Sequence, residues 1–571
     1  MFGRYRTNPM PLPLVWVMRG IVVLSLATLG LGWAASSPIG GSPDDDYHLG
    51  SIWCPPPVGQ SGCDIRVIDG EERVAVPETV SDQVPCYKFQ SDVSGACQLP
   101  MSDHRTVYTS RYDAGNYPFG YYQFHHLFVG DSVATSVLLM RAFNVFIAVA
   151  LLSAIAFLLP TYLRTPYSLA MLVSWLPMGV YFIASNNPSS WSMTGVLAYA
   201  AAFRGSLETE GKQRYSLLAL SVVGLVLSCT SRADSAFYIF VVTLAMLLST
   251  RWTRSALNWA IAAYGVLASI VGIWIMTSTS VASNVTDAVV TGESFSKVVL
   301  SNILSLPKYI AGFWGYRRGP GWFDIYLDGP VEVFSLLVVG MALYVGARYL
   351  TWRKTLAALV LAGATLGIPI FLGIQADYPF TVEMYQPRYM FPLAAVFFFI
   401  WFTGLGKEKV FTTPQYLMTC VALVIVQGIS MHTVLERYIF GQFNVMVHVN
   451  LNFAKLWWWH TSIEPMTVFI VATMGLVVAM VITPILLRNA VLIPVDVDDI
   501  EKSDIQSLEM MIDAGDRSEL NESRHVIAPY LPSSTDGQAV TGTDIAESVV
   551  SYSVNENPDI NDSGSEKSAS D

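Results

Sequence analysis

The sequence predicts an all-α integral membrane protein with about twelve transmembrane helices, within a range of about 10–13, from its composition and from recurring apolar stretches. Of the 571 residues, 53% are hydrophobic and only 13% are charged, whereas about 25% of the residues in soluble domains are charged. A helix needs about 20 largely apolar residues to cross a bilayer, and such stretches recur between Leu14 and Leu487. A soluble globular protein is therefore excluded.

These stretches define a membrane domain over residues 14–487, preceded by a short segment, residues 1–13. The expected spans cover approximately residues 14–35, 133–159, 167–184, 191–204, 215–230, 236–250, 256–277, 331–350, 355–374, 389–405, 413–431 and 465–487. The first stretch ends at Ala34-Ala35-Ser36, which resembles a signal-peptide cleavage site. Its long apolar run favours a retained membrane anchor instead.

Lys and Arg occur in alternate loops, which predicts the orientation of the chain. Cytoplasmic loops carry an excess of these residues. If the N-terminus is cytoplasmic, the inner segments contain Arg4, Arg6, Arg164, Arg204, Lys212, Arg214, Arg251, Arg254, Arg348, Arg353, Lys354, Lys407, Lys409 and Arg488. This distribution predicts an even number of spans with both termini in the cytoplasm, and it places the long loops at residues 36–132 and 278–330 outside.

Four of the six cysteines, Cys54, Cys63, Cys86 and Cys97, lie in the first of these outer loops. Disulfides persist in oxidising compartments, so the cysteines predict two disulfides and agree with an outer location. Three pairings are compatible with the sequence. A four-cysteine zinc site is the alternative, but the paired C-x2-C spacing of a zinc ribbon is absent.

Residues 488–571 form an acidic tail rich in Ser, Asp, Glu and Asn, with almost no aromatic residues. Such a composition cannot bury enough apolar surface to offset the entropy of the chain, so the tail is expected to be disordered and cytoplasmic. A solubilising or regulatory role and a docking segment for a cytoplasmic partner are both compatible with it.

Three carboxylates and an imidazole follow the first span, at Asp44, Asp45, Asp46 and His48. A Gly- and Pro-rich turn at residues 37–43 places them near the outer membrane surface. Adjacent carboxylates repel each other, so they suit either a divalent metal bound by Asp44 and Asp46 or a proton-transfer role in which one acid has a raised pKa. The structural alternative is that an aspartate caps a short helix.

An aromatic segment at residues 117–126, beginning with Tyr117, leads toward the second span, which contains Arg141 and Asn144. Aromatic residues at this depth commonly form an interfacial belt. The functional interpretation is a helix along the membrane that shapes a site for a lipid-linked or sugar substrate. The two interpretations are compatible.

Two short outer turns carry polar residues that are costly at membrane depth. The first, residues 185–191, contains Asn187, and the second, residues 231–235, contains Arg232 and Asp234. Ionisable groups at this depth usually pair with each other or bind substrate. An Arg232–Asp234 pair and an arginine that reaches the lipid headgroups are the structural alternatives.

A third outer segment, residues 375–389, ends with Arg388 and Tyr389 at the start of a span. Arginine keeps its charge and binds phosphate through two donors, so Arg388 suits a lipid phosphate. A simple headgroup contact is the alternative. Arg317 and Arg318 in the second long outer loop suit an anionic glycolipid or the bilayer surface.

No signature of a soluble enzyme accompanies these residues. The sequence contains no P-loop, H-E-x-x-H, G-x-S-x-G or dinucleotide-binding fingerprint, which disfavours an ATP-driven pump. The two halves do not repeat convincingly, which disfavours a transporter built from inverted repeats. No nucleic-acid partner is expected.

The polar segments match a known pattern in order: residues 43–48 (Pro-Asp-Asp-Asp-Tyr-His), 116–122, 187–189 and 386–392 (Gln-Pro-Arg-Tyr-Met-Phe-Pro). They resemble the bacterial membrane proteins of domain-of-unknown-function family 2142, over most of the membrane domain but not the tail. That family commonly has Pro-Asp-Glu-x-x-His at the first segment, so an aspartate here replaces the glutamate while His48 is kept.

The family in turn resembles the GT-C superfamily of membrane glycosyltransferases. This resemblance implies a multi-helix bundle, membrane-parallel helices in the first outer loop, and a polyprenyl-phosphate sugar donor. It also implies that an acid after the first span, here Asp44, Asp45 or Asp46, deprotonates the acceptor, with His48 in support. Arg232 and Arg388 would then hold the lipid phosphate.

The predicted function is transfer of a sugar from a polyprenyl phosphate to a cell-envelope glycan or glycolipid, on the outer face of a bacterial plasma membrane. Tyr117, Asn187, Asp234 and Tyr389 complete the expected substrate site. No cofactor is required, with a divalent metal as the alternative. A noncatalytic transporter or flippase for envelope lipids, with the same charges along its path, is the competing function.

Overall fold

The computed structural model describes most of the membrane domain. The described residues are 10–81, 84–250, 253, 255–279, 294–316, 319–327, 329–375, 382, 385–405, 412–441 and 448–491. The chain divides into two units, Met1–Ile493 and Pro494–Asp571. The second unit, which makes up most of the predicted tail, lies outside the described residues, as do Arg317 and Arg318.

Within its described residues, the first unit is mostly helical. Its helices are α1 (Leu12–Ala35), α2 (Asp45–Trp53), α3 (Gly120–His126), α4 (Val133–Leu158), α5 (Thr161–Trp175), α6 (Met178–Ile183), α7 (Ser189–Leu207), α8 (Gly211–Ser231), α9 (Ala233–Ser249), α10 (Ala256–Ser278), α11 (Phe295–Ala311), α12 (Pro330–Gly346), α13 (Trp352–Gln375), α14 (Phe391–Trp401), α15 (Thr413–Phe440) and α16 (Pro465–Val491). Short 3-10 turns include η3 (Gly95–Gln98), η4 (Gly312–Trp314) and η6 (Pro387–Met390).

Seven of these helices are long and apolar enough to cross a membrane: α1, α4, α8, α10, α13, α15 and α16. The segments Ala233–Ser249, Pro330–Gly346 and Pro387–Trp401 are apolar but shorter. Each expected span coincides with helical structure, but the predicted number of about twelve spans is not confirmed. The expected span at 167–184 is wrong as a continuous helix, because α5 ends at Trp175 and α6 begins only after Pro177.

The long segment between α1 and α4 contains a small antiparallel sheet, so the prediction of an all-α protein is wrong for this segment. Strands β1 (Ile65–Ile68), β2 (Glu71–Pro77) and β3 (Thr106–Thr109) pair in the order β1-β2-β3. Asp69 and Gly70 both have positive φ and form the two-residue hairpin turn between β1 and β2. The side chains of β2 alternate between buried and less buried positions, the period of two of a strand with one face covered.

The two predicted disulfides are confirmed, and the structure selects one of the three pairings. Cys54 pairs with Cys63, and Cys86 pairs with Cys97. The first disulfide joins the end of α2 to the segment before β1. The second closes a short loop that lies against α15.

Helix α7 is the centre of the bundle, with every one of its residues buried. It packs closely against α8 where Gly195 faces Gly224. A Cβ atom on Gly224 would lie 2.5 Å from the backbone nitrogen of Tyr199. Small residues that let helix backbones approach closely are typical of packing in membranes.

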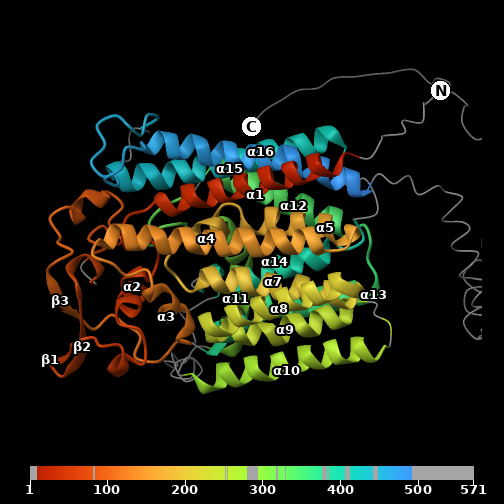
Figure 1. The fold of residues 1–571 in the computed structure, drawn as a ribbon, viewed down its shortest axis with the longest axis horizontal. Coiled ribbons are helices and arrows are strands. Elements are labelled where there is room, and N and C mark those ends of the chain that lie inside the picture. The colour runs from red at the N-terminus through yellow and green to blue at the C-terminus, as the bar shows by residue number, and fades with distance from the viewer. Residues whose placement is uncertain are drawn as a thin grey trace, which may run out of the picture. The chain divides into compact units, whose positions relative to one another are not determined.

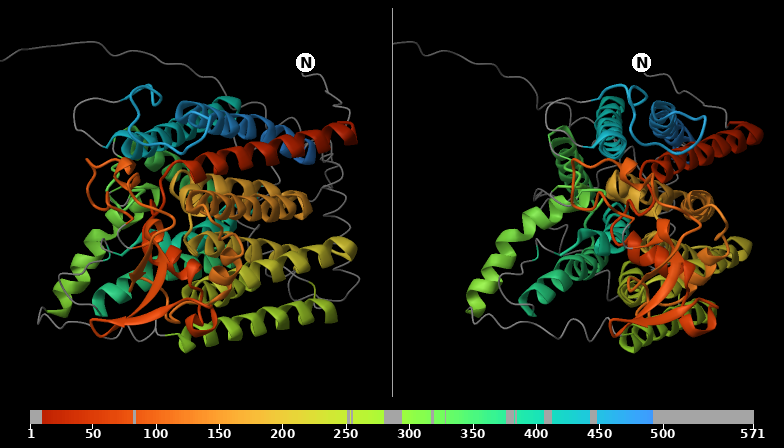
Figure 2. Two further views of the ribbon diagram at one scale, coloured as in Figure 1. Left: turned by 60° about the vertical axis from the view of Figure 1, so that its left-hand side comes forward. Right: turned by 90° about the vertical axis from the view of Figure 1, so that its left-hand side faces the viewer.

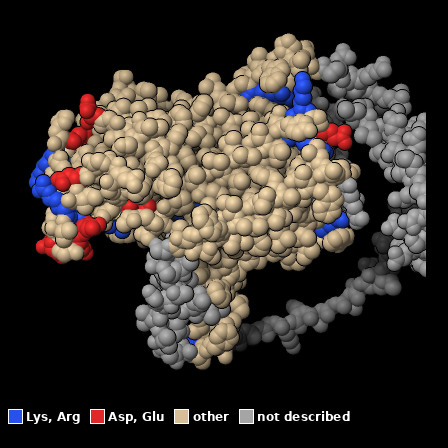
Figure 3. Space-filling view, turned by 60° about the horizontal axis from the view of Figure 1, so that its bottom comes forward, with Lys and Arg blue, Asp and Glu red and all other residues tan. Residues whose placement is uncertain are grey.

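The long helices run side by side, and residues 36–132 gather at one end of them, here called the loop end (Figure 1). The connection between α15 and α16 lies at the same end. Figure 2 shows the sheet at this end and α10 at the edge of the bundle. On the face drawn in Figure 3, Lys, Arg, Asp and Glu gather toward the two ends, while the broad surface between them is nearly free of charge. This distribution fits a membrane protein.

Candidate functional site

The turn between α1 and α2, residues 36–44, is held by side chains from distant parts of the chain. They donate hydrogen bonds to its backbone carbonyl groups and to those at the end of α1. Arg141 donates to the oxygens of Ala34, Ser37 and Pro38, and Trp459 donates to the oxygen of Ala35. Tyr87 and Gln98 donate to the oxygen of Ile39, and Trp322 donates to the oxygen of Gly40. Tyr181 and Tyr438 donate to the oxygen of Gly41, and Asn187 donates to the oxygen of Pro43. Buried carbonyl groups need such partners. The position of the acidic cluster is therefore fixed by the whole bundle.

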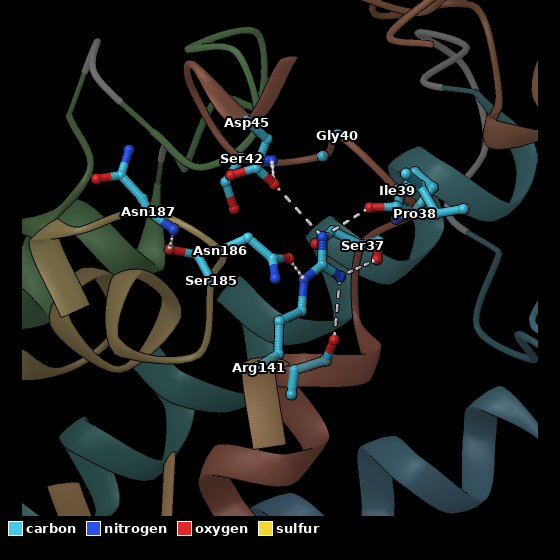
Figure 4. Close-up of polar contacts among 12 residues, drawn as sticks. Ser37, Pro38, Ile39, Gly40, Ser42, Asp45, Arg141, Ser185, Asn186 and Asn187 are labelled. Atoms are coloured by element: carbon cyan, nitrogen blue, oxygen red, sulfur yellow. Dashed lines mark hydrogen bonds and ion pairs between the residues drawn. The ribbon is translucent and has the colours of Figure 1, made fainter. Parts of the chain in front are cut away.

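Arg141 of α4 is fully buried and fully bonded (Figure 4). Its Nε donates to Asn186 Oδ1 at 2.7 Å, while its two terminal nitrogens donate to the turn. One of them also lies 3.5 Å from Asp45 Oδ2. The polar residue that the sequence places inside the second span thus anchors the turn.

The three neighbouring aspartates have different environments. The side chain of Asp44 is 41% exposed, whereas those of Asp45 and Asp46 are 0% and 2% exposed. Asp45 accepts from the Ser42 backbone and pairs with Arg141. Burial raises the pKa of Asp45 to about 7, although the Arg141 guanidinium opposes that rise. Of the three, Asp44 is the acid that a substrate could reach.

Asp44 is the N-cap residue of α2 and has a left-handed backbone, with φ 61°. The alternative that an aspartate of this cluster lies at the start of a short helix is therefore correct for the position of Asp44. Its side chain makes no capping bond and instead accepts from an Arg388 terminal nitrogen at 2.5 Å. Burial raises the pKa of Asp44, but the charge and hydrogen bond of Arg388 outweigh that effect and hold the pKa below its ordinary value. Asp44 is ionised at neutral pH.

Arg232, at the junction of α8 and α9, lies beside this pair. Its Nε and one terminal nitrogen bind both oxygens of Asp234, at 2.9 and 2.8 Å, so the predicted Arg232–Asp234 pair is present. The Tyr389 ring lies 4.7 Å from the Arg232 guanidinium and 4.9 Å from that of Arg388. Tyr389 therefore joins the two arginines, and its hydroxyl accepts from Arg388.

His48 completes this group from one turn along α2. Its Nδ1 lies 2.9 Å from the hydroxyl of Tyr122, and its ring packs edge-on against Tyr117. Burial lowers the pKa of His48 to about 3, so the imidazole is neutral at physiological pH. His48 is therefore a buried, uncharged hydrogen-bonding group beside Asp44.

Seven of the predicted site residues thus form one group, called the Asp44 cluster. Its members are Asp44, His48, Tyr117, Arg232, Asp234, Arg388 and Tyr389. They come from the start of α2, the segment before α3, the α8–α9 junction and η6. The three remaining predicted residues play other parts. Asn187 is buried, where it donates to the Pro43 carbonyl and accepts from the Ser189 backbone nitrogen. Asp45 sits in a buried ion pair with Arg141, and the buried Asp46 pairs with two partly exposed cations.

Asp46 accepts from Arg111 at 3.1 Å and from Lys88 at 3.3 Å. The oxygens of Asp44 and Asp46 therefore face cations, which opposes binding of a divalent metal between them. Within the described residues, no three His, Cys, Asp or Glu side chains are grouped for metal binding. The residues present do not fit the metal alternative.

A crevice too narrow to hold a water molecule borders the Asp44 cluster next to η6. Apolar side chains of Met178, Phe182, Phe323 and Phe391 line it together with Gln386 and Arg388. Arg388 Nε and Gln386 Oε1 are both buried without a partner. A buried donor left unbonded is costly, so Arg388 retains binding capacity toward a ligand.

Sequence reasoning missed Lys88, Arg111, Asp113 and Arg437. Asp113 accepts from the Tyr47 hydroxyl and from the backbone nitrogen atoms of residues 115–117, which fixes the segment that carries Tyr117. Arg437 of α15 is buried and binds Asp324 at 2.7 Å. For Arg111 and Asp113, the sequence offers one indication, a pair of charges among the aromatic residues that precede α3. For Lys88 and Arg437 it offers none.

The comparisons with known proteins agree with the predicted family. No curated protein and no solved structure matches the chain. A family model described as predicted membrane protein, domain of unknown function 2142, matches residues 27–397. The match begins within α1 and ends within α14, so it includes every member of the Asp44 cluster. The chain therefore belongs to the predicted membrane protein family of domain of unknown function 2142.

Proposed function

We propose that the chain is a membrane glycosyltransferase that moves a sugar from a polyprenyl-phosphate donor to a cell-envelope acceptor. The observation that carries the proposal is the Asp44–Arg388 pair. It combines one accessible, ionised carboxylate with an arginine that is not fully bonded. The resemblance of the family to GT-C glycosyltransferases supports the same class by analogy.

In the proposed reaction, a hydroxyl oxygen of the acceptor forms a bond to the anomeric carbon of the sugar. The bond from that carbon to the phosphate oxygen breaks, and its electron pair leaves with the lipid phosphate. Asp44 accepts the hydroxyl proton as the general base. The neutral imidazole of His48 would orient the acceptor through a hydrogen bond.

Arg388 links the two halves of this reaction. While it binds Asp44, it holds the pKa of that carboxyl low, which makes the carboxylate a weak base. A donor phosphate that takes over the Arg388 donors would leave Asp44 without this partner and raise its pKa. Arrival of the donor would therefore strengthen the base.

The negative charge on the departing phosphate needs fixed cations. Arg388 and Arg232 are held 4.9 and 4.7 Å from the same Tyr389 ring, which suits two guanidinium groups for one phosphate. The exposed apolar surface of the bundle suits the polyprenyl chain, which would remain in the bilayer.

The proposed location is a bacterial plasma membrane with both termini in the cytoplasm and the loop end outside. The disulfides Cys54–Cys63 and Cys86–Cys97 support an outer position for this end, because disulfides persist in oxidising compartments. The acceptor would be an envelope glycan or glycolipid. A cytoplasmic partner for the tail at residues 488–571 remains a further proposal.

The test is sugar transfer by the purified protein in lipid nanodiscs from a panel of polyprenyl-phosphate sugars. Asp44→Asn is expected to lower the transfer rate by about 10²–10⁴-fold, the usual contribution of a general base, while donor binding is retained. Asp69→Asn in the exposed hairpin turn removes a carboxylate from the same loop and should leave transfer unchanged.

Absence of transfer by the unmodified protein across the donor panel would contradict the proposal. Lipid movement between leaflets without any transfer would instead support the flippase. Equal rates for Asp44→Asn and the unmodified protein would exclude Asp44 as the base.

A further inference from the structure

Asp46 is shared by two cations that the proposed reaction does not use. Arg111 binds it through Nε and a terminal nitrogen, at 3.3 and 3.1 Å, and Lys88 binds it at 3.3 Å. The Asp46 side chain is almost fully buried, whereas those of Lys88 and Arg111 are 30% and 42% exposed. The buried Asp46 carboxylate thus fixes both cations, while part of each cationic side chain remains accessible to solvent.

The backbone segments that carry Lys88 and Arg111 are both held in place by other parts of the chain. Lys88 lies inside the loop closed by Cys86–Cys97. Carbonyl groups of the same loop, including those of Tyr87 and Gln90, bind the buried Arg437. This arrangement keeps Lys88 at the loop end.

Arg111 is fixed through its backbone. It follows β3, and its carbonyl oxygen would lie 2.6 Å from a Cβ atom on Gly50 of α2. Only a glycine allows this close approach of the two segments. The Arg111 guanidinium lies 5.4 Å from the centre of the Tyr47 ring, next to His48.

Aromatic side chains connect these cations to the Asp44 cluster. The Lys88 ammonium lies 3.9 Å from the Trp322 ring. The next residue in sequence, Phe323, lies 5.5 Å from the Arg388 guanidinium. Phe89 packs edge-on against Trp322 and is largely exposed. Lys88 and Arg388 therefore border the same aromatic surface.

Backbone strain is concentrated here as well. Asp44, Phe89 and Phe323 adopt positive φ angles of 61°, 58° and 64°. A bulky residue rarely adopts this conformation, and strain of this kind is commonly found at binding and catalytic sites.

Lys88 and Arg111 are two cations that share one carboxylate. Arg388 pairs with Asp44 and Arg232 pairs with Asp234, whereas Lys88 and Arg111 both pair with Asp46. The nearby Asp113 accepts from the Tyr47 hydroxyl. His48 is neutral, and Asp45 and Arg141 pair below the turn. Once a donor phosphate occupies Arg388 and Arg232, the remaining positive charge lies at Lys88 and Arg111.

We propose that Lys88 and Arg111 form an acceptor subsite for a glycan that carries phosphate or carboxylate groups. This inference rests on the proposed glycosyl transfer and names the acceptor class. The two cations would hold the acid group, Phe89 would contact the apolar face of a sugar ring, and a hydroxyl would reach Asp44. Neutral glycans would lack the charge contacts.

Binding is measured first, because it does not depend on turnover. The probes are a pentyl disaccharide and the same disaccharide with one phosphate monoester, titrated calorimetrically into full-length protein in nanodiscs. An excess of farnesyl phosphate is present to occupy Arg388 and Arg232. The unmodified protein should prefer the phosphorylated probe, and added salt should weaken the preference.

Lys88→Gln and Arg111→Gln should each reduce this preference by about fivefold, as expected for a partly exposed ion pair, with little change for the neutral probe. Lys88→Arg should retain it. Arg66→Gln on β1 is the matched control, since it removes an exposed arginine from the same loop, and it should have no effect.

Equal affinity of the unmodified protein for the two probes would overturn the inference, as would a preference that survives both Gln substitutions. A variant that loses affinity for both probes equally would also contradict it, because that result indicates general damage.

The transfer assay separates this inference from the proposed function. With transfer observed, the ratio of kcat/KM for charged and neutral acceptors should fall in Lys88→Gln while kcat for the neutral acceptor is kept. Without transfer from any donor, the glycosyltransferase proposal fails, whereas the binding preference still decides whether Lys88 and Arg111 hold an anion.

Discussion

Two buried arginines lie on either side of the turn after α1, and they differ in how completely they are bonded. Every side-chain nitrogen of Arg141 has a partner, including three carbonyl groups and Asp45. Arg388 binds Asp44, the Tyr389 hydroxyl and, at 3.5 Å, the Pro43 carbonyl oxygen of the turn, but its Nε has no partner.

This difference suggests a structural role for Arg141 and a binding role for Arg388, although both contact the same turn. Replacing a partner of Arg141 with a ligand would break the turn, because no donor is left over. In the proposed reaction, Arg388 would exchange Asp44 for a donor phosphate, and water could then solvate the partly exposed Asp44. The bonding of Arg141 fits a role in the scaffold, and that of Arg388 fits the proposed role in binding.

The largest expected effect is on the scaffold. Arg141→Met should lower the free energy of unfolding by about 3–5 kcal/mol, because it leaves Asp45 and several carbonyl groups buried without partners. Thermal unfolding in detergent measures this change. Arg105→Met, which removes an exposed arginine of the same loop end, should cost less than about 1 kcal/mol. Similar losses of unfolding free energy in Arg141→Met and Arg105→Met would contradict the structural role of Arg141.

Arg388→Gln should instead lower activity. Removing one charged contact to the departing phosphate is expected to reduce kcat about 100-fold, with a small change in the unfolding temperature. Activity in a transfer assay and thermal unfolding of the same preparation provide both readings. A stability loss as large as that of Arg141→Met would place Arg388 in the scaffold as well.

Gly41→Ala sharpens the comparison at the turn itself. The added Cβ would lie 2.7 Å from Ser37 Cβ and 3.0 Å from the Pro38 carbonyl oxygen, so we expect a loss of about 1–3 kcal/mol from overpacking. Gly340→Ala on α12 meets no atom within 4 Å and serves as the control. An unchanged unfolding temperature in Gly41→Ala would indicate that the turn can move.

A further effect is a dependence of stability on pH. The pKa of Asp45 rises from 3.8 to about 7 on folding, so the folded state binds this proton more tightly than the unfolded state does. The stabilisation is present below about pH 4 and is lost as the pH rises toward 7, by at most about 1.4 kcal/mol per pH unit. Asp45→Asn should flatten this slope in thermal unfolding measured from pH 4 to 8. An equal slope in both proteins would mean that Asp45 stays ionised.

Much of this architecture follows from local patterns. Apolar stretches of bilayer length predicted a helix at nearly every place where one is found, and four cysteines in one loop predicted two disulfides. The broken helix at Pro177, helix α11 within the expected loop at 278–330 and the sheet at residues 65–109 were missed. A proline in an apolar run does not by itself end a helix in a membrane protein, and the short strands have few residues from which to read a period.

The Asp44 cluster was predicted from the order of polar turns after successive spans, which the membrane brings to one surface. The roles of the three aspartates could not be predicted in the same way. Asp44 and Asp45 are neighbours in sequence, and they differ only because Arg141 and Arg388 approach from positions about 100 and 340 residues away. Contacts across such separations leave no local pattern.

The hydrogen bonds to the turn also set an order of assembly during synthesis. Tyr438 and Trp459 bind the carbonyl groups of Gly41 and Ala35, yet they are translated about 400 residues later, beyond the family match that ends at residue 397. A nascent chain that has reached residue 397 already contains every member of the Asp44 cluster but still lacks these two hydrogen bonds. Insertion of α15 and synthesis of the segment that carries Trp459 would then complete the hydrogen bonds to the turn.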